Sequence, residues 1–69
     1  MATLFQDAMD HSRFVRIVET TGKRALCDIF WQERNNTMFY GGRAYVPVSL
    51  FSDDKRNAII GFVAAKTIN

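Results

Sequence analysis

The chain has 69 residues, of which 48% are hydrophobic, 23% charged and 13% aromatic, and its formal net charge is +2. These values are typical of a globular protein and exclude chains that are mainly disordered, collagen-like or of low complexity. The length accommodates a single domain, which we assign to residues 1–69. Because so short a chain buries only about 60% of the surface that its unfolded form exposes, its core needs good packing, self-association or a partner.

Cysteine and histidine are too few to reinforce this core. Cys27 is the only cysteine, which excludes a disulfide within the chain, and Cys27 with His11 cannot complete a tetrahedral zinc shell. We therefore expect no metal and no other cofactor. No signal peptide is recognised at the N-terminus, and the longest apolar stretch, residues 58–65, is far shorter than the roughly 20 residues of a membrane span. We expect a cytoplasmic protein with no membrane partner, and the unpaired cysteine agrees with a reducing compartment.

The first predicted element is a short helix over residues 3–10. Thr3 is suited to cap its N-terminus. The apolar residues of this segment recur at helical spacing, namely Leu4, Phe5, Ala8 and Met9. A helix this short depends on packing against the rest of the protein.

Three strands are predicted next, over residues 13–20, 24–33 and 37–40, because these segments are rich in β-branched and aromatic residues. Gly22 marks the turn between the first two strands, and Asn35-Asn36 marks the turn between the second and third. The glycine pair at 41–42 then bends the chain or forms a bulge. Residues 43–50 form a fourth extended segment, in which Pro47 cannot donate to a neighbouring strand, so we expect an edge strand or an irregular crossing.

A C-terminal helix is predicted to begin at Ser52, which would cap it ahead of two acidic residues, and to run to about Thr67. Gly61 and Ala65 would form a smooth patch on this helix, suited to close packing on the sheet or to helix pairing in a dimer. A strand over residues 59–63 is the competing interpretation, because this stretch combines β-branched residues with a glycine.

The favoured fold class is therefore α+β. We expect a three- or four-stranded antiparallel meander with the C-terminal helix packed on it and the short N-terminal helix beside it. The alternative is a small open β-barrel, in which the C-terminal segment is a strand.

The predicted strand pairing distributes the side chains over two faces of the sheet, and neither face is polar throughout. Tight turns place Phe14 opposite Ile29 and Trp31 opposite Tyr40. Both faces then carry large apolar side chains, whereas a half-buried antiparallel sheet normally alternates apolar and polar residues. Since a monomer rarely exposes a large apolar patch, we expect the protein to bind another macromolecule or a second copy of itself.

No catalytic arrangement is predicted. Cys27 and His11 are the candidate nucleophile and base, but the predicted pairing separates them by about 16 Å along the strand direction. Asp28 is unusual because it lies in the middle of a strand among apolar residues, and we expect it to pair with an arginine such as Arg13 or to mark an exposed position. The glycine pair at 41–42 lacks the residues of a phosphate-binding loop. We therefore predict no enzyme and no catalytic residue.

Tyrosine, tryptophan and arginine dominate the binding energy of protein interfaces. The candidate partner-binding residues are Trp31, Tyr40, Arg43, Tyr45, Arg34 and Arg16. The predicted function is that of a small non-enzymatic regulator or inhibitor that occupies the surface of a partner protein, as a monomer or a homodimer. Free-standing domains of this size often have this role in viruses and mobile elements. In this interpretation Trp31→Ala weakens partner binding by more than about 2 kcal/mol and leaves the fold intact.

A nucleic-acid-binding module is the alternative function. Aromatic side chains on a sheet can stack on bases while arginines at the rim contact phosphates. The arginines available for this are Arg16, Arg24, Arg34 and Arg43. The sequence has neither a ribonucleoprotein signature nor helix-turn-helix spacing, so this interpretation depends on which aromatics are exposed.

Overall fold

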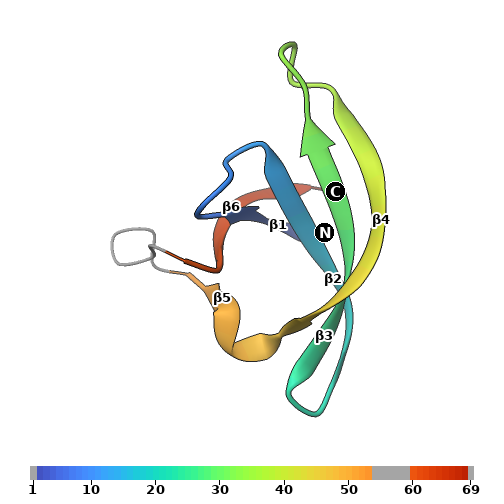
Figure 1. Ribbon diagram of the computed structural model, residues 1–69, viewed down its shortest axis with the longest axis vertical. Coiled ribbons are helices and arrows are strands. Elements are labelled where there is room, and N and C mark those ends of the chain that lie inside the picture. Colours follow the sequence, from blue (N-terminus) through green and yellow to red (C-terminus); the bar gives the residue numbers. More distant parts are fainter. Residues whose placement is uncertain (1, 54–59, 69) are drawn as a thin grey trace.

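The computed structural model describes residues 2–53 and 60–68 of the chain. These residues form one 6-stranded sheet in the order β4-β3-β2-β1-β6-β5 (Figure 1). The strands are β1 (Ala2–Asp7), β2 (Arg13–Thr21), β3 (Arg24–Gln32), β4 (Met38–Pro47), β5 (Phe51–Ser52) and β6 (Phe62–Ile68). A short 3-10 helix, η1 (Val48–Leu50), joins β4 to β5. Neighbouring strands are antiparallel, except for β5 and β6, which are parallel.

The expected α+β fold is wrong, because most of the described residues in the two segments predicted as helices lie in strands and none of them is helical. Most of the predicted N-terminal helix is β1, which pairs with β2 on one side and with β6 on the other. Pairing on both sides satisfies the backbone of β1 along its length, whereas a helix of this length is marginal by itself. In the part of the chain that the structure describes, no helix has the length and apolar character needed to cross a membrane.

The C-terminal segment is also extended. Residues 54–59 of the predicted helix lie outside the described residues, and Phe62 begins β6. Gly61 has a φ of 89°, which interrupts a helix, so the predicted helical patch of Gly61 and Ala65 does not form. The competing strand interpretation agrees with the structure over residues 62–63. The sheet nevertheless remains open, because β4 and β5 are its two edges and are not paired with each other.

The middle of the chain follows the sequence pattern closely. β2 and β3 are the predicted strands, and Gly22 has a positive φ of 61° in the turn between them. The two segments predicted around the glycine pair join into one continuous strand, β4, and the pairing with β3 shifts between Ile29 and Phe30. The glycine pair therefore forms a bulge and does not end the strand. Pro47 lies at the end of β4, an edge strand, as predicted.

The pairing of both hairpins differs from the prediction, by one residue over most of their length and by two residues next to the turn between β2 and β3. Phe14 pairs with Phe30 and not with Ile29, and Trp31 pairs with Phe39. A further irregularity in β2 accompanies the two-residue turn between β2 and β3. Because side chains alternate along a strand, the slip of one residue moves the side chains of residues 13–17 to the other face of the sheet relative to β3, whereas the slip of two residues near the turn leaves theirs on the predicted face.

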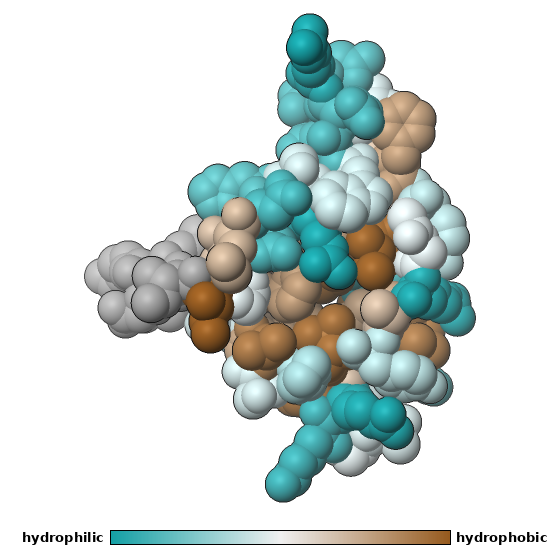
Figure 2. Space-filling view, viewed as in Figure 1, coloured by the Kyte–Doolittle hydropathy of each residue, from teal (hydrophilic) through white to brown (hydrophobic). Residues whose placement is uncertain are grey.

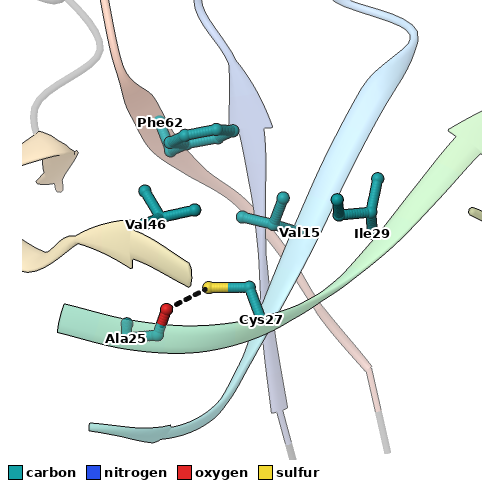
Figure 3. Packing of buried hydrophobic residues seen from close by; sticks show 6 residues of the cluster. All are labelled: Val15, Ala25, Cys27, Ile29, Val46 and Phe62. Atoms are coloured by element: carbon teal, nitrogen blue, oxygen red, sulfur yellow. Dashed lines mark hydrogen bonds between the residues drawn. The ribbon is translucent and has the colours of Figure 1, made fainter. Parts of the chain in front are cut away.

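The curved sheet encloses a core on its concave side (Figures 1 and 3). The buried core residues are Val15, Ala25, Cys27, Ile29, Val46 and Phe62. Figure 3 shows Phe62 of β6 above Val46 of β4 and Val15 of β2, so strands from both halves of the sheet meet there. Figure 2 shows hydrophobic residues in the middle of the molecule and hydrophilic residues over its upper and lower tips.

Candidate functional site

A buried carboxylate lies on the face of the sheet opposite the core. Asp28 alternates along β3 with the core residues Cys27 and Ile29, and its side chain is only 5% exposed. Its cross-strand partners are Arg16 of β2 and Arg43 of β4. Both arginines therefore reach Asp28 from the neighbouring strands.

Three side chains donate hydrogen bonds to this carboxylate. Arg16 Nη2 lies 2.7 Å from Oδ2, and Arg43 Nε lies 2.8 Å from Oδ1. The hydroxyl of Tyr40 donates to Oδ1 at 3.3 Å. The hydrogen bonds from Arg16 and Arg43 hold the pKa of Asp28 below its usual range, and Asp28 in turn raises the pKa of Arg43. The group thus combines two cations with one anion, and Asp28 fixes the positions of both guanidinium groups.

The lowered pKa of Asp28 predicts a contribution to acid stability. The ionised carboxylate stabilises the fold above the usual pKa of 3.8, and this contribution is lost as the pH falls through the lower folded-state value. We expect Asp28→Asn to lower the melting temperature by several degrees at pH 7 and to flatten its decline below pH 4. Thermal unfolding followed by circular dichroism between about pH 7 and pH 2 measures both effects.

Asp10→Asn is the matched control for this experiment. Ser12 lowers the pKa of Asp10 through its hydroxyl and its backbone N–H, so Asp10 also contributes in acid. Its partner is neutral, and hydrogen bonds to charged partners are stronger, so we expect a smaller change than for Asp28→Asn. Equal acid profiles for the wild type and Asp28→Asn would show that the carboxylate has no such role.

Aromatic rings surround the buried carboxylate on the same face. The guanidinium of Arg16 lies 5.5 Å from the ring centre of Phe30, which packs edge-on against Tyr40 at 5.9 Å. Arg24 lies 4.9 Å above the ring of Tyr45. Tyr40 is 62% exposed and Tyr45 58%. We call this surface the arginine–tyrosine face, and it consists of Arg16, Arg24, Asp28, Phe30, Tyr40, Arg43 and Tyr45.

A shallow apolar hollow adjoins the arginine–tyrosine face. It is lined by Leu4, Phe30, Met38 and Lys66, so that Phe30 belongs to both surfaces. The ammonium group of Lys66 lies 5.2 Å from the ring centre of Phe14, which is buried. The hollow therefore extends the arginine–tyrosine face with apolar surface and with a further positive charge, that of Lys66.

The structure brings together four of the six predicted binding residues, namely Arg16, Tyr40, Arg43 and Tyr45. Trp31 lies on the opposite face, where its indole covers Gly41, and a Cβ at Gly41 would come 2.6 Å from Nε1. The guanidinium of Arg13 lies 5.8 Å from the same indole. Arg34 is exposed in the turn between β3 and β4. The expected effect of Trp31→Ala on binding remains a prediction, but Trp31 does not belong to the arginine–tyrosine face.

The centre of the site was missed from the sequence. The sequence predicts that Asp28 pairs with an arginine such as Arg13 or marks an exposed position. Asp28 is buried and does pair with arginines, but these are Arg16 and Arg43, while Arg13 lies 3.5 Å from Asp7. The available signal was an acid in the middle of an apolar strand, with an arginine in each flanking strand. Only the correct pairing of the strands places all three side chains side by side.

The candidate catalytic pair is separated by the fold. Cys27 is buried in the core, where its thiol lies 3.6 Å from the carbonyl oxygen of Ala25, and burial raises its pKa. His11 is exposed in the turn between β1 and β2. Over residues 2–53 and 60–68, no three histidine, cysteine or acidic side chains are grouped as metal ligands.

No protein-family model matches the chain, and no curated protein or solved structure matches it. Its function is therefore inferred from the site.

Proposed function

We propose that this protein is a small non-enzymatic regulator or inhibitor that binds a partner protein through the arginine–tyrosine face. The observation that supports this most directly is the fixing of Arg16 and Arg43 by Asp28 beside the exposed rings of Tyr40 and Tyr45. Arginine and tyrosine are the residue types that supply most binding energy in protein interfaces. Because Asp28 already holds the two arginine side chains in place, less side-chain conformational entropy is lost when a partner binds.

The charges of this face favour a protein partner over nucleic acid. Asp28 offsets part of the positive charge of Arg16 and Arg43, which otherwise could neutralise phosphates. The adjoining hollow offers apolar lining residues to a partner side chain. A polar rim around a small apolar centre is the usual composition of a protein interface.

The test is a pull-down from a native lysate with the tagged chain, followed by nuclease treatment and a salt wash. We expect one protein to be recovered in near-stoichiometric amount, and we expect Arg43→Ala and Tyr45→Ala each to reduce its affinity at least about tenfold. Phe39→Ala is the matched control, because Phe39 is an exposed aromatic paired with Trp31 on the opposite face. Equal affinity for all four proteins would disprove the assignment of the binding face.

Nucleic-acid binding is the second candidate, because two exposed tyrosines lie next to arginines on the sheet. Tyr45 carries Arg24 above its ring, and Tyr40 lies beside Arg43 in the same cluster. If this function holds, a fluorescent oligothymidylate binds the chain, and its affinity falls steeply between about 50 and 200 mM salt. Binding that is absent, or that does not respond to salt, would rule it out.

We also propose a cytoplasmic location. The support for it is the free, buried thiol of Cys27, which is compatible with a reducing compartment.

A further inference from the structure

β4 is a long strand at the edge of the sheet. It spans ten residues and pairs with β3, and within the described part of the chain no strand lies along its other side (Figure 1, right). The opposite edge is β5, which has only two residues. An unpaired edge presents backbone N–H and C=O groups to which another strand can add.

Alternate residues in the C-terminal half of β4 direct their backbone groups toward this free edge. The N–H of Val48, just after β4, donates to the carbonyl of Lys23 at 2.9 Å and so points toward β3. In an antiparallel pair, the direction of the backbone groups alternates from residue to residue. Val46 and Ala44 therefore face β3, whereas Tyr45 and Arg43 face outward. Pro47 belongs to the outward set, where its missing N–H removes no bond to β3.

The same two residues carry side chains that a partner can reach. Tyr45 is exposed, and the side chain of Arg43 is about half-exposed with its Nε bound to Asp28. β4 contains no acidic residue, and Arg24 lies above Tyr45. Asp28 offsets only part of the charge of Arg43, and Arg24 lies close by, so the edge carries a small net positive charge that suits a few acidic side chains.

We propose that the free edge of β4 binds an extended, acidic segment of the partner protein as an added strand. The backbone groups of Arg43 and Tyr45 form the ladder, an acidic side chain of the partner lies opposite Arg43, and an apolar one lies opposite Tyr45. This inference rests on the proposed function and specifies how the partner is recognised.

The first experiment selects binders from a displayed library of random octapeptides on the immobilised full-length chain. We expect the enriched peptides to share an acidic residue followed or preceded, two positions away, by an aromatic or β-branched residue. This spacing arises because side chains two residues apart lie on the same face of a strand. A library that yields no binders, or binders without acids, overturns the proposal.

The second experiment removes the outward N–H without altering a side chain. Cys27 allows the full chain to be assembled by chemical ligation, with the amide at Tyr45 replaced by an ester. We expect the Kd for an enriched peptide to rise about five- to tenfold, which is the loss of affinity expected when one hydrogen bond is removed. The control is the same replacement at Ala44, whose N–H faces β3. It keeps the outward N–H of Tyr45 and only weakens the Arg43 carbonyl as an acceptor, so we expect a loss of stability and a smaller rise in Kd than for the ester at Tyr45.

The outcomes separate this proposal from the proposed function. If Arg43→Ala weakens partner binding but the ester at Tyr45 does not change the Kd, the face binds through side chains alone and strand addition is wrong. If neither change has an effect, both proposals fail. A concentration-dependent dimer that the ester at Tyr45 dissociates would assign the edge to a second copy, and oligothymidylate competing with the peptide would assign it to nucleic acid. Either result overturns the acidic-strand proposal.

Discussion

Replacing Phe62 by alanine is expected to lower the free energy of unfolding by about 3–5 kcal/mol. The side chain is 6% exposed and stacks on Phe51 at a centroid distance of 5.4 Å. The guanidinium of Arg13 lies 5.8 Å from its ring centre. Phe62 also connects β6 to Val15 and Val46 in the core cluster (Figure 3), so its removal leaves a cavity between the two halves of the sheet.

Urea unfolding followed by circular dichroism measures this loss as a shift of the midpoint. Phe39→Ala is the matched control, because Phe39 is 52% exposed, and we expect it to cost about 1 kcal/mol or less. The stability of a chain of this size is commonly of the same order as the loss expected for Phe62→Ala, so we expect that variant to be partly unfolded without urea. Similar midpoints for the two variants would contradict the assignment of Phe62 to the core.

Gly61→Ala is expected to cost about 3 kcal/mol, through two additive causes. The φ of Gly61 is 89°, a region that residues with a Cβ rarely adopt. A Cβ at this position would also collide with the carbonyl oxygen of Leu50, which belongs to the backbone and cannot rotate away. The carbonyl of Gly61 accepts a hydrogen bond from the N–H of Ala8 at 2.9 Å, so a shift here also disturbs the end of β1.

Gly42→Ala separates the two causes. Gly42 has a φ of 106°, but a Cβ there meets no atom within 4 Å, so only the backbone strain of about 1–2 kcal/mol is expected. The difference between the two urea midpoints therefore measures the close approach of Gly61 to Leu50. Equal losses would show that the backbone near Leu50 adjusts without cost.

The central hairpins could be predicted because local chemistry and tertiary packing favour the same conformation there. The β-branched and aromatic residues of β2 and β3 favour strands, and Gly22 suits the positive φ of the turn between them. Pro47 indicated an edge strand because it lacks an N–H, and β4 is at the edge. These features depend on the residue itself and its nearest neighbours.

The two ends of the chain depended on contacts that local patterns do not encode. The apolar residues between Leu4 and Met9 fit a helix by spacing, but β1 is stabilised by strands on both sides, one of which is β6 from the other end of the chain. Pairing with so distant a segment outweighs the weak helical preference of a short stretch. The same contacts make β6 a strand from Phe62 onward.

The binding face required the pairing of the strands to be known to a single residue. Arginine and tyrosine were recognised from the sequence as candidate binding residues, and the cluster of Arg16, Asp28 and Arg43 was not. A shift of one residue in β2 relative to β3 places Arg16 either beside Asp28 or on the core side of the sheet. The turn geometry and the bulges in β2 and β4 determine which of the two strand alignments forms. The alignment that places Arg16 beside Asp28 is stabilised because it buries the core residues on one face of the sheet.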